Sequence, residues 1–208
     1  MATLRGCGLS PAYRSRAASP GSAASHLCLG PGWSSAANTP LRRHKAWVHE
    51  GGISTPLIAH WPRGINAHGQ LRNTPGHVID LVPTILELAG GGRAETWNGQ
   101  PVPVPPGRSL VPLFARGGGV ARDFLRWQHE GNRAIRIGNW KLVAAGVEAP
   151  WELYDLERDR GESHNLAVER ADKTCELETA WQRHFEEFCK LAAEDIGAAP
   201  SRDLRRRE

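Results

Sequence analysis

The chain has 208 residues, enough for one large domain or two small ones, and apolar residues make up 40% of it. Eight Trp and a net charge of only +4 distinguish it from disordered chains, which are usually strongly charged and poor in aromatic residues. The first 27 residues carry a net charge of +3 and the last seven carry +2, so the part between them carries −1. The composition therefore argues against a nucleic-acid-binding face, which needs Lys and Arg clustered on one structured side.

Targeting and cysteine signals are weak. No run of 18 apolar residues occurs, so the sequence predicts no membrane span. The N-terminus holds Arg residues without a following apolar run of signal-peptide length, and the location of the protein stays open. The four Cys form no Cys-x-x-Cys pair, which argues against a zinc knuckle or a thioredoxin-like site.

The first half of the chain predicts one strand and one helix. Residues 1–29 are rich in Ser, Ala, Arg, Gly and Pro without an apolar period, and we expect them to be disordered or unrelated to the rest. A short buried strand is expected over Thr55–Trp61, which begins and ends beside prolines. A helix is expected over His77–Ala89, with Asp80 as N-cap and glycines after its end. This alternation is typical of the edge of an α/β sheet.

The second half predicts a small sheet and a helix. Gly and Pro dominate residues 91–121, which we expect to be a linking loop with one ordered turn at Leu110–Phe114. An amphipathic helix is expected over about residues 170–194, because large apolar residues recur there at helical spacing. Between them, Gly138 and Asn139 suit a two-residue hairpin turn. The expected strands of this antiparallel sheet are Phe124–His129, Arg133–Ile137, Trp140–Ala144 and Trp151–Leu156.

These elements predict an α/β fold class, in the sense of an α+β fragment with four parts. The edge of an α/β sheet comes first, followed by a four-stranded antiparallel sheet with a C-terminal helix. The parts are a disordered or unrelated segment (1–29), an α/β piece with its Gly/Pro-rich linker (30–121), a sheet-plus-helix subdomain (122–195) and a basic tail (196–208).

The most informative stretch for chemistry surrounds Lys45, which stands five residues before Glu50-Gly51-Gly52. The two glycines permit a tight turn and a close approach of the backbone. A lysine on a loop beside the edge of an α/β sheet can bind a tetrahedral anion as a point charge. A solvated surface pair of Lys45 with Glu50 remains the alternative. Glu50 is the only acidic residue between positions 30 and 79, so we expect no complete metal site there.

This stretch resembles the arylsulfatase family of sulfatases, in the alkaline-phosphatase-like superfamily. The shared pattern over residues 38–58 is Asn-Thr-Pro-x-Arg-x-x-Lys-x-x-x-x-Glu-Gly-Gly-Ile-x-Thr-Pro-Leu-Ile. The Asp-x-x-Pro-Thr segment that begins at Asp80 follows in the expected order, as do Trp140-Lys141-Leu142-Val143 and the Trp151–Leu156 segment. The resemblance runs from about residue 30 to about residue 190 and covers only the C-terminal part of a sulfatase.

The resemblance implies hydrolysis of sulfuric esters, with Lys45 as a catalytic contact to the sulfate group. His49 and His129 are weaker candidates for substrate binding. The family uses a formylglycine nucleophile, made from the Cys or Ser of Cys/Ser-x-Pro-x-Arg, and a divalent metal, usually calcium. Neither that motif nor the Asp-Asn-Gly that precedes the matching lysine occurs in this sequence. We therefore expect no metal ligand and no cofactor in this chain.

Two functions remain open. In the first, the chain is the C-terminal part of an arylsulfatase-like protein, the product of a truncated or mis-started gene, and is inactive by itself. The substrate of the complete family member would be a small sulfate ester or a sulfated glycan, and the family is often periplasmic or secreted. In the second, the chain is a non-catalytic interaction or accessory module derived from a sulfatase, without a nucleic-acid or membrane partner.

Overall fold

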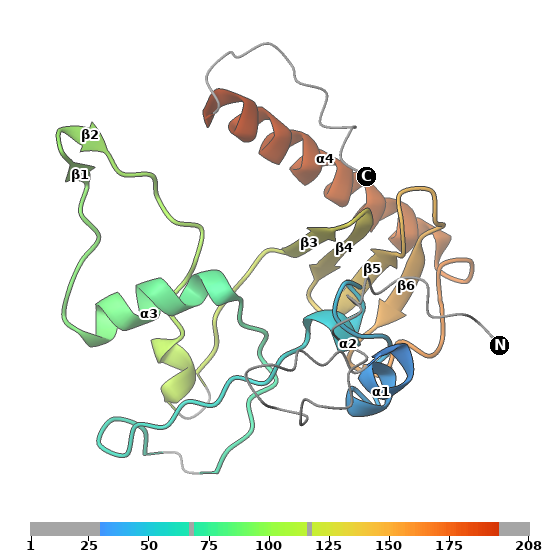
Figure 1. The fold of residues 1–208 in the computed structure, drawn as a ribbon, viewed down its shortest axis with the longest axis horizontal. Helices are drawn as coiled ribbons and strands as arrows, with labels where there is room; N and C mark the ends of the chain where they lie inside the picture. The colour runs from blue at the N-terminus through green and yellow to red at the C-terminus, as the bar shows by residue number, and fades with distance from the viewer. Residues whose placement is uncertain (1–29, 67–68, 116–117, 196–208) are drawn as a thin grey trace, which may run out of the picture. The chain divides into compact units, whose positions relative to one another are not determined.

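The computed structural model describes residues 30–66, 69–115 and 118–195 (Figure 1). They form two compact units, of which the first joins the residues up to Ser54 to those from Arg126 onward. The second unit holds Thr55–Leu125. The segment 1–29, expected to be disordered, and the basic tail 196–208 lie outside the described residues.

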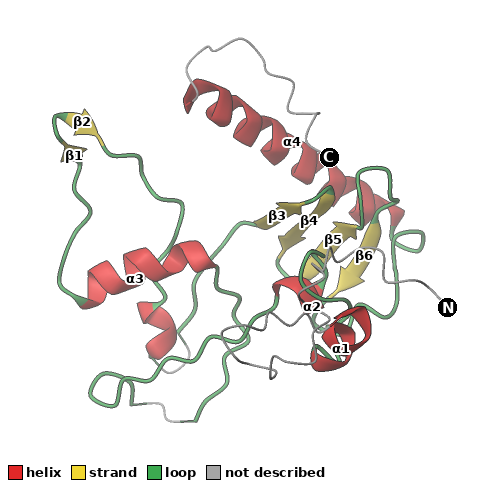
Figure 2. Cartoon of the chain, viewed as in Figure 1, coloured by secondary structure: helices red, strands yellow, loops and turns green. Residues whose placement is uncertain are grey.

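The predicted four-stranded sheet and long helix are confirmed (Figure 2). The strands follow one another in chain order, and β5 pairs antiparallel with β4 on one side and β6 on the other. Their bounds are β3 (Leu125–His129), β4 (Asn132–Ile137), β5 (Trp140–Ala144) and β6 (Glu152–Asp155), and α4 spans Ala171–Asp195.

Tight turns fix the register of this sheet. Gly138, with φ of 60°, opens the turn between β4 and β5 and leaves Ile137 opposite Trp140, as the Gly-Asn pair predicted. Between β3 and β4, Glu130 and Gly131 both adopt left-handed conformations, with φ of 47° and 76°. Two such residues in succession match the twist of a two-residue hairpin.

The sheet carries buried side chains on both faces. Ile135, Leu142 and Leu153 lie side by side across three strands and are fully buried. Helix α4 contacts β4 and β5, and its Leu177 is fully buried too. A second apolar cluster combines Val48, which precedes α2, and Leu156, which follows β6, with the sheet residues Ala134, Val143 and Tyr154.

Two helices of the first unit were not predicted. They are α1 (Gly30–Ala37) and α2 (Glu50–Ile53). Helix α1 lacks the charged residues that mark helix ends, with no acid in its first turn and no base in its last. Helix α2 is a single turn, and Ile53 packs against the second apolar cluster. Tertiary packing explains α2, since so short a helix has little stability of its own.

The second unit confirms the helix expected over His77–Ala89. The 3-10 turn η2 (Val78–Asp80) continues directly into α3 (Leu81–Leu88). The ordered turn expected at Leu110–Phe114 is confirmed as η3 (Val111–Phe114). None of the described helices is both long enough and apolar enough to cross a membrane.

Two expectations for the second unit were wrong. Residues 55–61 form no strand, and Ile58 is 88% exposed. A strand needs a neighbour for its backbone hydrogen bonds, and no described segment pairs with these residues. Conversely, the stretch 91–121 contains a small hairpin, β1 (Thr96–Trp97) and β2 (Gln100–Pro101), around a left-handed Asn-Gly turn.

Asp80 explains the Asp-x-x-Pro-Thr segment. Its buried carboxylate accepts hydrogen bonds from the N–H groups of His77 (2.7 Å) and Arg108 (2.9 Å) and from the guanidinium of Arg122 (2.6 Å). The Thr84 hydroxyl donates to the Asp80 carbonyl over 2.6 Å. Burial alone raises the pKa of this carboxyl, but the hydrogen bonds outweigh burial and hold the pKa below its usual value. Asp80 takes the predicted N-cap position, yet its side chain ties the unit together instead of capping α3.

Candidate functional site

Lys45 lies on the segment between α1 and α2, residues 42–47, which we call the Lys45 loop. The Lys45 side chain is exposed, and it makes no hydrogen bond or ion pair with any residue that the structure describes. Glu50 is buried and pairs with a different lysine, so the alternative of a surface pair with Lys45 is wrong. The Lys45 ammonium is therefore a cation without a described carboxylate partner.

Two glycines allow the loop to turn closely over α2. A Cβ atom on Gly51 would lie 2.2 Å from the carbonyl oxygen of Arg43, and one on Gly52 would lie 1.9 Å from that of Trp47. The Gly51 N–H donates to the Arg42 carbonyl over 2.9 Å. The close backbone approach predicted for these glycines is confirmed.

Left-handed residues flank Lys45 on both sides. Arg43 has φ of 67° and Ala46 has φ of 86°. A residue with a Cβ atom persists in such a conformation, at a cost of about 1–3 kcal/mol, only when its surroundings hold it there. The Asn38 side chain donates to the Arg43 carbonyl (3.3 Å), and the Asn132 side chain donates to the Ala46 carbonyl (2.8 Å). The loop is thus held on both sides of Lys45.

A buried cluster of charges anchors the segment that follows the loop. Lys141 of β5 is fully buried, and its Nζ lies 2.9 Å from Glu50 Oε1 and 2.7 Å from Glu162 Oε1. The Glu50 N–H donates to Glu162 Oε2 over 2.8 Å. Arg160 adds a positive charge, with Nε 3.9 Å from Glu50 Oε2. These contacts join α2 to the sheet and to the segment after β6.

A second polar network surrounds Glu152 of β6. One guanidinium nitrogen of Arg42 lies 2.6 Å from Glu152 Oε2 and 2.5 Å from the Tyr154 hydroxyl, which itself donates to Glu152. His49 is fully buried, with Nε2 3.4 Å from the same carboxylate oxygen, and no described residue partners its Nδ1. His49 therefore contacts the Glu152 network in the interior.

This network shifts the pKa values of three of its members, Arg42, Glu152 and Tyr154; burial lowers the pKa of Arg42, but the Glu152 carboxylate raises it above its ordinary value. The hydrogen bond from His49 has the largest effect on Glu152 and lowers its pKa to about 2, against the opposing effect of burial. The hydrogen bonds from Tyr154 and Arg42 contribute to the same lowering. Burial and the adjacent Glu152 carboxylate raise the pKa of Tyr154 above its ordinary value. The network is therefore built around an ionised carboxylate.

His129 lies at the end of β3 and is exposed, with 57% of its side chain accessible. Its Nε2 is 3.7 Å from Glu130 Oε1. Within the described ranges, no contact links His129 to Lys45 or His49. His49 thus lies just after the Lys45 loop, at the start of α2, whereas His129 takes no part in their described contacts.

The described residues do not fit the calcium site that the family implies. Among them, no group of three His, Cys, Asp or Glu side chains is placed to hold a metal ion. Glu50 and Glu162 form a buried acidic pair, but Lys141 occupies the position between their carboxylates. Calcium takes about six or more oxygen ligands, which this cluster does not offer.

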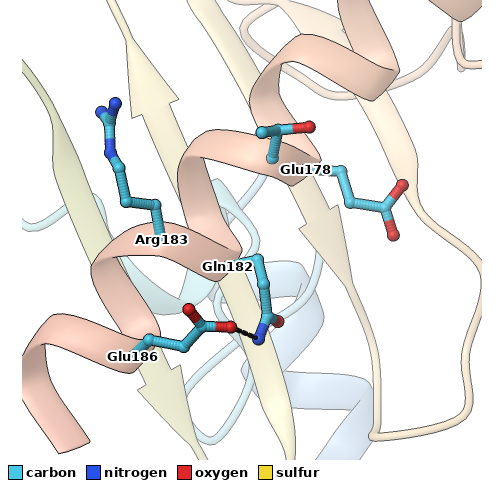
Figure 3. A pocket seen from close by; sticks show the side chains of 5 residues that line it. Glu178, Gln182, Arg183 and Glu186 are labelled. Atoms are coloured by element: carbon cyan, nitrogen blue, oxygen red, sulfur yellow. Dashed lines mark hydrogen bonds between the residues drawn. The ribbon is translucent and has the colours of Figure 1, made fainter. Parts of the chain in front are cut away.

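Two shallow hollows lie on the described surface of the first unit. One lies along α4 and is lined by side chains of that helix alone, with Gln182 donating to Glu186 over 2.7 Å (Figure 3). It contains none of the candidate residues. The other borders the Glu152 network, and its lining includes Arg42, Glu152, Tyr154 and Glu162.

Sequence reasoning missed Lys141, Glu162 and Glu152 as residues that build the site. Lys141 and Glu152 lie in segments that carry the family resemblance, Trp140-Lys141-Leu142-Val143 and Trp151–Leu156. The available signal was a lysine within an otherwise apolar strand, because a buried lysine requires acidic partners.

Glu152 gives a pH prediction for the first unit. Its pKa in the folded chain, about 2, lies below the ordinary value of 4.5, so its contribution to stability is present above pH 4.5 and is lost as the pH falls toward 2. Glu152→Gln should lower the melting temperature at pH 7, and the difference from the unsubstituted chain should shrink steadily between pH 4.5 and pH 2. Thermal unfolding followed by circular dichroism checks this. Glu148→Gln, at an exposed position, is the control, and a pH-independent difference for Glu152→Gln would contradict the assignment.

The sequence of this chain is similar to a protein family and to individual known proteins. The family model described as Sulfatase matches residues 19–91, which include the Lys45 loop, both glycines and Asp80. The match begins inside the segment 1–29, for which no resemblance was expected. An uncharacterised sulfatase of Schizosaccharomyces pombe is 36% identical over 177 residues, which are 82% of this chain and 32% of that protein. Arylsulfatase K of Danio rerio is 28% identical over 147 residues, 65% of this chain and 26% of that protein.

The fold is also similar to that of a solved structure. The crystal structure of Ps i-CgsB has a TM-score of 0.57 and 27% identity, covering 72% of this chain and 32% of that one. A second structure of that protein contains k-i-k-neocarrahexaose. This chain spans about a third of the length of the Schizosaccharomyces pombe relative and of Ps i-CgsB. The family model, the relatives and the shared fold together show that the chain belongs to the sulfatase family.

Proposed function

We propose that this chain provides part of a sulfate-ester site, in which the Lys45 ammonium contacts the sulfate group. The observation that carries the proposal is an exposed ammonium without a described partner, on a loop whose carbonyls are bonded on both sides of it. An ammonium binds a tetrahedral anion as a point charge. A cation fixed in place before the reaction stabilises negative charge that develops on the sulfuryl oxygens.

The geometry supports Lys45 more strongly than the two histidines. His49 is fully buried and bonds to Glu152, so its place in the structure is that of a support for the segment after the loop. His129 is exposed, but its described partner is its neighbour Glu130. For both, substrate binding remains a weaker proposal.

The relatives support a proposal for the substrate class. Their names describe sulfatases and arylsulfatases, and Ps i-CgsB has been crystallised with k-i-k-neocarrahexaose. We propose a sulfate ester, either a small molecule or a sulfated glycan, as the ligand of the site to which Lys45 contributes. In the family, formylglycine supplies the nucleophile and calcium neutralises charge.

A stand-alone accessory module is the second candidate function, and the second unit argues against it. Helix α3 leaves large apolar side chains open to solvent, with Val82 60%, Ile85 63% and Leu88 42% exposed. Clustered apolar exposure of this kind indicates a surface that another protein segment covers. A module that functions alone should be soluble and monomeric, whereas aggregation of the expressed chain would favour the sulfatase part.

Bound sulfate should protect the Lys45 ammonium group from chemical acetylation. The chain has four lysines, of which Lys190 is exposed and Lys141 is buried. Inorganic sulfate at tens of millimolar should slow the acetylation of Lys45 by acetic anhydride about twofold or more, as expected near half-saturation of a weak site. Mass spectrometry of each lysine, with chloride at equal ionic strength as control, measures this. Equal rates at Lys45 with and without sulfate, or equal protection of Lys190, would rule out the contact.

The chain by itself should not hydrolyse sulfate esters, because its sequence holds no Cys/Ser-x-Pro-x-Arg from which the nucleophile could form. With calcium and an aryl sulfate, we expect no release of sulfate above that of a blank without protein. The matched control is the Lys45→Ala chain, which should give the same background. Calcium-dependent turnover that disappears in Lys45→Ala would overturn this prediction.

A further inference from the structure

The Lys45 loop is held by a side chain from the C-terminal sheet, 86 residues further along the chain. Asn132 is the first residue of β4, and its Nδ2 donates to the Ala46 carbonyl over 2.8 Å. We propose that Asn132 is a positioning residue that presets the Lys45 ammonium for a sulfate oxygen. This inference rests on the proposed function of Lys45.

The bond acts at the residue that directly follows Lys45. Ala46 has φ of 86°, a conformation that an alanine does not favour, so an external contact must hold it. A hydrogen bond to its carbonyl fixes the orientation of the peptide that follows. With Ala46 fixed, the Cα–Cβ direction of Lys45 is fixed as well, and the ammonium explores a smaller volume.

The other described bonds to the loop act on the opposite side of Lys45 or inside the loop. The Gly51 N–H bonds to the Arg42 carbonyl, and the Asn38 side chain bonds to the Arg43 carbonyl. The Trp47 N–H bonds to the His44 carbonyl within the loop itself. Among the described hydrogen bonds of residues 46–47, which follow Lys45, the bond from Asn132 is therefore the one that comes from outside the loop.

Burying the Asn132 side chain costs free energy that packing by itself does not explain. It is 5% exposed, and its Oδ1 is buried without a partner among the described residues. A buried amide with an unpaired oxygen is destabilising, so an apolar residue of similar size would suit a purely structural role better. Its amide nitrogen, in contrast, donates a hydrogen bond to the Ala46 carbonyl. The bond to Ala46 is therefore the contribution of this amide that the described contacts show.

Limited trypsin digestion of the full chain tests the positioning role, because the loop itself contains cleavage sites after Arg43 and Lys45. Asn132→Ala removes the donor, and Asn132→Leu removes it while keeping the volume filled. Mass spectrometry gives the cleavage rate after Lys45 relative to that after Arg136 of β4. General destabilisation raises both rates together, whereas loss of positioning raises the ratio.

We expect the ratio to rise severalfold in both Asn132 variants and sulfate protection of Lys45 from acetylation to weaken. The control is Asn139→Ala, which removes an exposed side-chain bond to Glu157 at another turn of the same sheet and should change neither readout. An unchanged ratio in both Asn132 variants overturns the positioning role. If the ratio rises but sulfate fails to protect Lys45 even in the unsubstituted chain, the proposed function falls, and with it the purpose assigned to Asn132.

Discussion

The first unit depends on the burial of one ammonium, that of Lys141, between the carboxylates of Glu50 and Glu162. Removing such charges from water is costly, and their attraction offsets the cost only when the geometry is good and the remaining polar atoms are bonded. The second oxygen of Glu162 accepts the Glu50 N–H, while the first lies 2.7 Å from Lys141 Nζ without hydrogen-bond geometry. The arrangement ties α2 to the sheet, so we attribute to it a role in specifying where α2 lies.

That placement determines the position of the Lys45 loop. Glu50 begins α2, and the Gly51 N–H beside it bonds back to the Arg42 carbonyl at the start of the loop. The Glu152 network holds the same segment from β6, through Arg42 and His49. Polar contacts from three strands, β4, β5 and β6, therefore converge on residues 42–50. The C-terminal sheet thus contacts the segment that carries Lys45, the residue for which the family resemblance implies a contact to sulfate.

Local patterns predicted the elements that depend on local sequence. The sheet and α4 follow from apolar spacing and from turn residues such as Gly138, and the structure confirms them. The strand expected at residues 55–61 is absent because its formation depends on a partner strand that no described segment provides. Asn98 and Gly99 carried a hairpin signal that was overlooked within a stretch rich in Gly and Pro.

The candidate site was predictable only in part. Lys45 and the two glycines stand out in the sequence because they belong to one continuous motif. The Lys141 cluster cannot be recognised in the sequence, because Glu50 and Lys141 are 91 residues apart and only the fold brings them together. The same holds for Asn132, whose partner Ala46 has no polar side chain that could indicate the contact.

The free energy of unfolding of the Lys141→Met chain tests most directly whether the buried charge cluster holds the first unit together. Urea denaturation followed by tryptophan fluorescence measures it. We predict a loss of about 3–5 kcal/mol, because two buried carboxylates are left without their cation, and partial recovery when Glu162→Gln is added. A Lys141→Met chain as stable as the unsubstituted one would show that neither α2 nor the Lys45 loop depends on this cluster, and would contradict the account.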